Sequence, residues 1–330
     1  MRWPLRLTYK TIIIIAACMT LGIVTAYASP STLQILPTAS TAIYIQVIIG
    51  GLLVGGVYVV AALGLTLVFG VMKIINIVHG DLIILGAYAS FWLYTLYKID
   101  PFISMIVSMP LFFAIGLPIQ KFLMNPALRR GIDQPLIISF GLSSILQYAM
   151  LTAWTANPRG VTTSYTGITY MMGDIPLSFI RFMILISAIV VLYLLHLFLT
   201  RTYLGIAIRA TSQEMEAASL MGIDINRVNL FSYALSLALA ATAGIFVSLI
   251  FGFEPSSGFV YLLKAFAVII FGGVGSLSGA LFGGLILGMG ESVGSFIVGA
   301  AYRDAIAYII FFLILLLRPT GILGRGRPLI

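Results

Sequence analysis

The sequence predicts an all-α fold: a polytopic bundle of transmembrane helices. Hydrophobic residues make up 61% of the 330-residue chain, and its mean hydropathy of +1.12 is one that no soluble globular domain approaches. Only 8% of the residues are charged, so many windows of about 20 residues lack charge and are long enough to cross a bilayer as a helix. These apolar runs are continuous, which favours helices over the alternating strands of a membrane barrel.

Residues 1–28 allow two interpretations. Three basic residues precede an apolar run at Ile12–Val24, and Ala26 and Ala28 follow it in a small-x-small pattern. This arrangement is typical of a secretory signal peptide. The same run is also long enough to be an uncleaved first transmembrane span, and the sequence does not decide between the two.

The rest of the chain consists of apolar runs separated by short polar segments. We expect about nine spans if residues 1–28 are cleaved and about ten if they are not, with broken helices among them. The expected runs are Ile43–Gly70, Ile74–Tyr97, Phe102–Leu123, Leu136–Trp154, Phe179–Leu199, Val228–Phe251, Gly258–Gly275, Gly279–Ile297 and Ala305–Leu317.

The distribution of basic residues predicts the orientation. If the N-terminus starts inside, most of the 18 basic residues fall on the cytoplasmic face. The expected exceptions are Lys98, Arg159, Arg181, Lys264 and Arg303. The net charge of +8 is therefore a signal of membrane orientation, and we expect no nucleic-acid partner.

The polar segment Arg201–Arg227 lies between two long apolar runs, on the expected cytoplasmic side. Its middle predicts a short amphipathic helix at about Ser212–Met221, with Ser212 as the N-cap. Glu214 and Glu216 would lie in its first turns, where carboxylates suit the helix dipole, and Gly222 would end it in the left-handed conformation. The expected apolar face consists of Ala217, Ala218, Leu220 and Met221. Such a helix is suited to docking into a groove on a soluble partner.

Glycines concentrate late in the chain, where Gly272, Gly273 and Gly275 precede Ser276. Close helix packing explains most of the glycines, because small residues at a spacing of four let helix backbones approach one another. A second interpretation is that Gly272–Ser276 breaks a helix at membrane depth and lines a substrate path, as broken helices do in transporters.

Asn76, His79 and Asp81 lie at the start of an apolar run. A carboxylate and an imidazole so close to lipid are unfavourable unless they face a cavity or a partner. One interpretation is an interfacial cap, with Asn76 or Asp81 holding a helix N-terminus. The other is a gate or an element of a substrate path. We expect no metal site here, because His79 and Asp81 would point to different helix faces.

A second charged set lies near the outer ends of the late spans and consists of Glu254, Lys264, Glu291, Arg303 and Asp304. Charges within apolar runs need opposite partners. We therefore expect structural ion pairs of Lys264 with Glu291 or Asp304. The alternative is that the set receives a substrate or a delivery protein.

No enzyme motif is present. The stretch Gly275–Gly279 has Leu277 where a nucleophile elbow needs serine, and the chain has no H-E-x-x-H, Walker A or Rossmann pattern. We therefore expect no catalytic activity and no cofactor in this chain. If solute is moved at the expense of ATP, another subunit must bind the nucleotide.

Glu216-Ala217-Ala218 followed by Gly222 matches the E-A-A-x-x-x-G signature of bacterial ABC importer permeases. Four ordered blocks, spread over about 260 positions, extend the match within residues 42–330: Gly64–Tyr88, Ala210–Val228, Leu263–Gly284 and Ala301–Gly324. Through them the chain resembles the permease family of branched-chain amino acid ABC transporters, which also includes urea and short-chain amide permeases.

The resemblance implies a permease of the prokaryotic inner membrane that works by alternating access. Two cytoplasmic ATPases would bind the ATP and receive a coupling helix near residues 212–222, formed by Glu214, Glu216, Ala217, Ala218 and Gly222. A second permease and an extracytoplasmic solute-binding protein would complete the assembly, and Asn76–Asp81 with Gly272–Ser276 would line the path. Urea or amides are the alternative substrates. An ion-coupled secondary transporter and an intramembrane hydrolase are less favoured classes.

Overall fold

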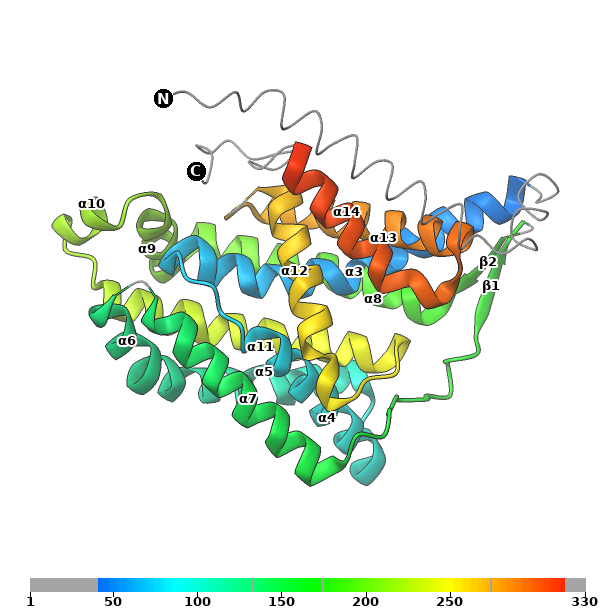
Figure 1. The fold of residues 1–330 in the computed structure, drawn as a ribbon, viewed down its shortest axis with the longest axis horizontal. Helices are drawn as coiled ribbons and strands as arrows, with labels where there is room; N and C mark the ends of the chain where they lie inside the picture. Colours follow the sequence, from blue (N-terminus) through cyan, green and yellow to red (C-terminus); the bar gives the residue numbers. More distant parts are fainter. Residues whose placement is uncertain (1–40, 132, 174, 274, 318–330) are drawn as a thin grey trace, which may run out of the picture.

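The structure is a computed structural model that describes residues 41–131, 133–173, 175–273 and 275–317. It confirms the predicted all-α bundle, whereas the predicted signal peptide or first span at residues 1–28 lies outside the described residues (Figure 1). The first helices are α3 (Thr41–Met72), α4 (His79–Tyr97), α5 (Pro101–Ile119), the π-helical η1 (Gln120–Met124), α6 (Asn125–Arg130) and α7 (Gln134–Trp154). The later ones are α8 (Phe179–Arg201), α9 (Tyr203–Gln213), α10 (Met215–Leu220), α11 (Ile225–Ile250), the 3-10 turn η2 (Pro255–Ser257), α12 (Gly258–Gly272), α13 (Leu277–Val298), the 3-10 turn η3 (Ala300–Tyr302) and α14 (Arg303–Leu317).

Among the described residues, 7 helical segments are long and apolar enough to cross a membrane. They are Ala42–Met72, Pro101–Arg130, Gln134–Trp154, Phe179–Arg201, Ile225–Ile250, Pro255–Gly272 and Leu277–Val298. The other expected spans, Ile74–Tyr97 and Ala305–Leu317, fall on α4 and α14.

Helices α3 and α11 form the centre of the bundle. In each of them 89% of the most apolar window is buried inside the protein. Helices α8, α12 and α13 pack against α3, whereas α4 and α5 pack against α11. Lipid-facing helices such as α7, with only 11% of its window buried, keep their apolar side chains on the outside, as expected in a membrane.

Helix α4 begins inside the bundle, because residues 73–78 form an irregular segment after α3 (Figure 1). The expected span from Ile74 was therefore wrong at its start, since the helix begins only at His79. Lys73 takes a positive φ of 56° directly after α3 and so ends that helix. At Gly80 a Cβ would lie 2.1 Å from the carbonyl oxygen of Gly258, so the first turns of α4 and α12 are in backbone contact.

The packing interpretation of the glycines is confirmed for several helix pairs. A Cβ at Gly244 would lie 2.0 Å from the carbonyl oxygen of Ile83, and one at Gly86 would lie 2.5 Å from the Cα of Ala241. Helices α4 and α11 therefore cross with their backbones in contact. The same holds where Gly272 meets Gly279, at the turn that joins α12 to α13.

Gly244→Ala is expected to destabilise the protein by about 1–3 kcal/mol, because the added methyl group collides with backbone atoms that cannot rotate away. Gly141 on α7 is a matched control, since a Cβ there would meet nothing within 4 Å. Gly141→Ala should leave the melting temperature in detergent unchanged or raise it slightly, since alanine is the better helix former. Equal melting temperatures for the two variants would contradict the close crossing.

A short hairpin and a loop cover one end of the bundle. Strand β1 (Thr169–Met172) pairs antiparallel with β2 (Ile175–Ser178), and these are the strands that the all-α prediction did not include. Within the preceding loop, the hydroxyl of Tyr165 donates a 2.6 Å hydrogen bond to Asp100, the N-cap of α5. Burial and this bond to a carboxylate both raise the pKa of Tyr165, so the hydroxyl keeps its proton and the loop stays tied to α5.

Candidate functional site: a projecting coupling helix and an interior charge network

The predicted docking helix is two helices joined by a break. Thr202 begins α9, and its hydroxyl accepts a 3.0 Å hydrogen bond from the backbone N–H of Gly205. Glu214 is extended, with φ −152° and ψ 107°, and separates α9 from α10. The single helix Ser212–Met221 with Ser212 as its N-cap was therefore wrong. The hydroxyl of Ser212 instead donates to the carbonyl of Arg209, 2.8 Å away within the last turns of α9.

The predicted helix stop at Gly222 is confirmed. Its φ is +86°, in the left-handed region. The N–H of Gly222 donates to the carbonyl of Ser219 at 3.0 Å, and that of Ile223 donates to Ala218 at 3.1 Å. A glycine adopts this conformation without the steric penalty that a side chain would bring, so the chain reverses here and enters α11.

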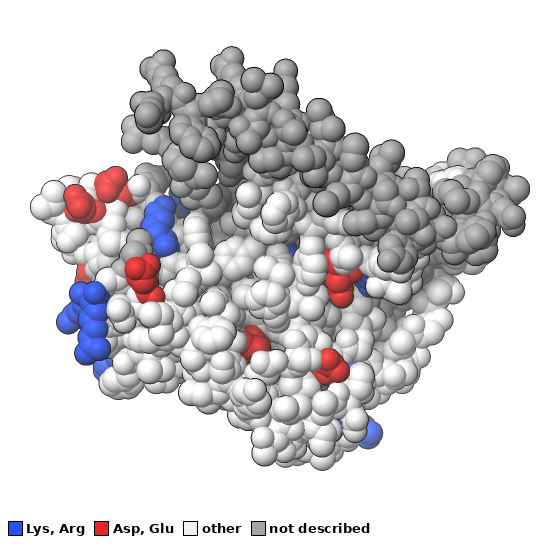
Figure 2. Space-filling model, in the orientation of Figure 1, with Lys and Arg blue, Asp and Glu red and all other residues white. Residues whose placement is uncertain are grey.

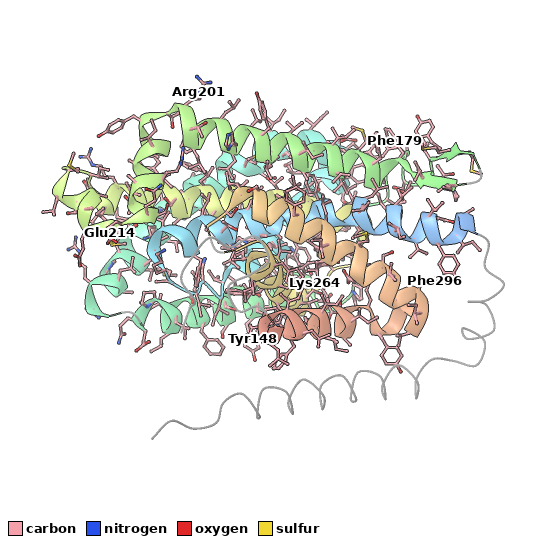
Figure 3. All side chains as sticks on the ribbon, turned by 90° about the horizontal axis from the view of Figure 1, so that it is seen from above. Tyr148, Phe179, Arg201, Glu214, Lys264 and Phe296 are labelled. Atoms are coloured by element: carbon pink, nitrogen blue, oxygen red, sulfur yellow. The ribbon has the colours of Figure 1, made fainter. Side chains whose placement is uncertain are left out.

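Helix α10 projects at one end of the molecule and carries exposed side chains (Figure 3). Leu220 is 89% exposed and Met221 is 84% exposed, whereas Ala218 is 5% exposed and packs onto this chain. The exposed part of the predicted apolar face is therefore Ala217, Leu220 and Met221, and Ala218 does not belong to it. The other predicted coupling residues, Glu214, Glu216, Ala217 and Gly222, are exposed.

The charge pattern supports placing α10 on the cytoplasmic side. Figure 2 shows basic side chains gathered at the same end of the molecule as the acidic tip of α10. Lys121, Arg129, Arg130 and Arg227 line one cavity at this end. Cytoplasmic loops carry such an excess of Lys and Arg.

Helix α9 connects the tip to the core of the bundle. It packs against both α3 and α11. In addition, the Lys73 ammonium donates a 3.5 Å hydrogen bond to the carbonyl of Ser212, which links the end of α9 to the irregular segment before α4. A displacement of α9 and α10 would therefore reach the two central helices and residues 73–78.

Asn76, His79 and Asp81 are all buried where α4 begins. His79 Nε2 lies 2.9 Å from the carbonyl oxygen of Ala61 on α3, and Asp81 accepts a hydrogen bond from Ser143 on α7. The side-chain amide of Asn76 lies near the hydroxyl of Tyr233 on α11. The cap interpretation was therefore wrong for Asn76, because α4 begins without any side-chain cap bond.

Gly272, Gly273, Gly275 and Ser276 form the turn between α12 and α13. Gly273 and Gly275 have φ of +83° and +79°, and Ser276 caps α13 by accepting a 3.0 Å bond from the N–H of Gly279. The glycines thus lie at the connection between two separate helices and do not break a single one. The backbones of Gly272 and Gly279 are in contact at this connection.

Both predicted path segments contact α3, at different levels. A Cβ at Gly64 would lie 2.8 Å from the ring of His79, whereas one at Gly70 would lie 3.4 Å from the Cα of Gly275. These glycines are about 9 Å apart along the helix axis at about 1.5 Å per residue. The structure therefore places the two segments along one helix.

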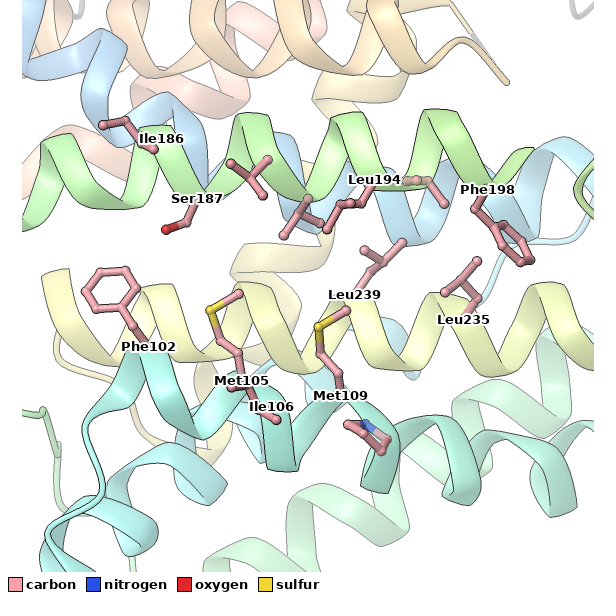
Figure 4. A pocket seen from close by; sticks show the side chains of 14 residues that line it. Phe102, Met105, Ile106, Met109, Ile186, Ser187, Leu194, Phe198, Leu235 and Leu239 are labelled. Atoms are coloured by element: carbon pink, nitrogen blue, oxygen red, sulfur yellow. The ribbon is translucent and has the colours of Figure 1, made fainter. Parts of the chain in front are cut away.

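The sequence interpretation missed an apolar cavity between α5, α8 and α11 (Figure 4). Its volume is about 590 Å³, and Ser187 is the only polar side chain among the described residues that line it. The apolar side chains that line it are Phe102, Met105, Ile106, Met109, Pro110, Ile186, Val190, Val191, Leu194, Leu195, Phe198, Leu235 and Leu239. No sequence signal identifies it, because it depends on which helices become neighbours.

The predicted ion pairs of Lys264 are confirmed, and they belong to a larger network in the second half of the bundle. The ammonium of Lys264 lies 2.8 Å from Glu291 Oε1 and 2.6 Å from Asp304 Oδ1. Arg303 Nε lies 2.8 Å from the same Glu291 oxygen. The hydroxyl of Tyr58 on α3 donates to the other oxygen of Glu291. Helices α3, α12, α13 and α14 are thus joined by charged hydrogen bonds.

Comparison with known proteins identifies the family. Residues 47–315 match the family described as branched-chain amino acid transport system / permease component. The chain belongs to this family. This permease family consists of membrane components of transport systems, and the chain is accordingly a multi-pass protein of the inner membrane.

Individual relatives of the permease family cover nearly all of the bundle. The chain is 33% identical over 298 residues to the high-affinity branched-chain amino acid transport system permease protein BraD of Pseudomonas aeruginosa, covering 86% of this chain and 96% of BraD. It is 30% identical over 300 residues to the LivH permease protein of Escherichia coli, covering 86% and 96%. A probable LivH permease of Methanocaldococcus jannaschii is 30% identical over 288 residues, covering 83% and 91%. No solved structure matches the chain.

Asp81→Asn is expected to lower the initial uptake rate of this permease about tenfold, because a hydrogen bond to a charged group is worth about 1.5–3 kcal/mol and the neutral amide makes a weaker one. Uptake of labelled solute into liposomes measures the rate. Asp100→Asn is the control, since Asp100 caps α5 and bonds Tyr165 at the end away from α10. Normal uptake by Asp81→Asn would leave Asp81 with a purely structural role at the start of α4.

Proposed function

We propose that the chain is the membrane-spanning subunit of an ABC importer for branched-chain amino acids. Membership of the permease family supports the transport role. The substrate is proposed from the names of the relatives, which are branched-chain amino acid permeases at 30–33% identity. The importer would pair this chain with a second permease, two cytoplasmic ATPases that bind the ATP, and an extracytoplasmic solute-binding protein.

The observation that carries the ABC assignment is the exposed tip of α10. Leu220 and Met221 are almost entirely exposed beyond the apolar bundle, and Glu214 and Glu216 lie on the same short segment. Large apolar side chains presented in this way favour an interaction with a soluble partner. An ATPase subunit would accept the two apolar side chains in a groove and pair the carboxylates with basic groups.

Alternating access would follow from the connections of α9. When the ATPases close on ATP, α10 would move with them, and α9 would transmit the displacement to α3, α11 and residues 73–78. Asn76, His79 and Asp81 lie where this movement arrives, so they would form the gate. The turn at Gly272–Ser276 would follow the end of α3 through its contact with Gly70.

Two other functions remain as alternatives. A urea or short-chain amide importer would have the same architecture and a different solute. An ion-coupled secondary transporter would work without ATPases, and the projecting α10 would then have no partner. The first alternative differs only in the solute, and the second differs in its need for ATP.

Co-purification and uptake distinguish these functions. The complex extracted in detergent is expected to contain two ATPase subunits, and liposomes that hold the complete transporter should import leucine only with ATP inside. Uptake by the purified chain alone without ATP would overturn the proposal in favour of a secondary transporter. ATP-dependent uptake of urea or an amide, without uptake of leucine, would replace the proposed substrate.

A further inference from the structure

The charge network around Lys264 consists of two buried side chains, Lys264 and Glu291, and two partly exposed ones, Arg303 and Asp304. We call the exposed pair the open part of the network. The side chains of Lys264 and Glu291 are 5% and 0% exposed, whereas those of Arg303 and Asp304 are 31% and 53% exposed. Replacing buried ion pairs by apolar side chains often leaves a protein equally stable. Stability alone therefore does not explain the buried pair of Lys264 and Glu291, and ionisable residues within a membrane bundle point to a functional site.

A polar cavity adjoins the open part. Its volume is about 290 Å³, and Lys264, Arg303 and Asp304 all line it. The remaining lining comes from the loop after α11, from α12 and from the turn before α14, and consists of Phe251, Gly252, Ser257, Val260, Tyr261, Ala300 and Ala301. Cavities for drug-sized ligands have volumes of about 300–1,000 Å³, so this one suits a smaller molecule.

The cavity lies away from the coupling helix. Figure 3 places Lys264 between the ends of the bundle, with Glu214 at one end and Phe296, on the last turn of α13, toward the other. The cavity residues Ala300 and Ala301 follow α13 at that other end. If α10 is cytoplasmic, the cavity opens on the extracytoplasmic side, where solute arrives.

The charges of the network determine which charged groups a ligand needs in order to bind there. Two cations, Lys264 and Arg303, are balanced by two carboxylates, Glu291 and Asp304. A ligand that separates Lys264 from Asp304 must replace both charges. A zwitterion does so without adding net charge, whereas urea or a neutral amide cannot replace either charge, and a simple cation or anion leaves one charge uncompensated.

We propose that this cavity is a receiving site for a zwitterionic α-amino acid. The substrate carboxylate binds Lys264 and Arg303, and its ammonium group binds Asp304. Glu291 stays bonded to Tyr58 and holds the cations in place. Phe251, Val260 and Tyr261 provide the wall for an aliphatic side chain. The inference rests on the proposed function as an amino acid importer and assigns the residues that first hold the substrate.

Binding of labelled leucine to the complete transporter in nanodiscs, without the solute-binding protein, tests the proposal. Wild-type binding should be saturable, and leucinamide, isocaproate and urea should compete weakly, because each lacks one or both charges. Asp304→Asn should weaken leucine binding at least about tenfold, which corresponds to about 1.4 kcal/mol, and Asp304→Glu should restore part of it. Asp100→Asn, which removes a carboxylate elsewhere on this end, should bind like the wild type.

A second variant leaves every charge in place. Ala301→Phe puts a ring into the cavity and should abolish leucine binding even if Asp304→Asn does not assemble. The proposal is overturned if the wild-type transporter imports leucine without binding it in this assay, or if both cavity variants bind it normally. Import of urea or an amide in place of leucine would instead overturn the proposed function.

Discussion

Glu216→Arg is expected to reduce ATP-driven uptake at least about 30-fold, since residues central to an interface contribute about 2 kcal/mol or more and each 1.4 kcal/mol is tenfold. Glu216 is exposed on α10, so the reversal removes no contact within the bundle. The added cation would face the basic groups proposed on the ATPase. The chain should still insert and melt normally, while the ATPase subunits are lost during purification.

Asp133→Arg is the matched control for this charge reversal. Asp133 is also exposed and precedes α7 without a side-chain cap bond. The control should retain the ATPases and the uptake. Leu220→Asp should reproduce the loss, because Leu220 is 89% exposed and is the proposed apolar anchor. Retention of the ATPases by both the Glu216 and the Leu220 variants would contradict the docking role of α10.

Lys264→Met is expected to destabilise the protein by about 3–5 kcal/mol, because it leaves a buried carboxylate without part of its compensation. Glu291 is fully buried and accepts bonds from Lys264, Arg303 and Tyr58. Removing the ammonium leaves Arg303 as the one cation bonded to Glu291 among the described residues. The melting temperature of the purified chain in detergent measures the loss.

The double variant Lys264→Met with Glu291→Met separates charge from packing. Removing both partners takes away the uncompensated charge, so part of the stability should return. Equal losses in the single and double variants would show that the uncompensated charge of Glu291 is not the cause of the destabilisation. The single variant should be less stable than Asp304→Asn, because Asp304 is partly exposed and water solvates what remains.

Whether a feature could be predicted from the sequence depends on whether residues close together in the chain determine it. Gly222 could be predicted because a helix end with positive φ is a property of a few adjacent residues. The ion pairs of Lys264 could be predicted because a charge in an apolar run must find an opposite charge. The break at Glu214 could not, since α9 is held by packing against α3 and α11, which no pattern within residues 201–227 reveals.

The sequence by itself determined that this protein is a bundle of membrane helices with a polar segment at Arg201–Arg227 between two of them, because hydropathy and turn residues act through the local chain. Only the tertiary structure decided where α4 starts, which glycines touch and which charges share a cavity. These features depend on helices far apart in the chain becoming neighbours. Tyr58 and Glu291 show the reason most clearly: their hydrogen bond joins α3 to α13, and neither residue's local sequence specifies the other.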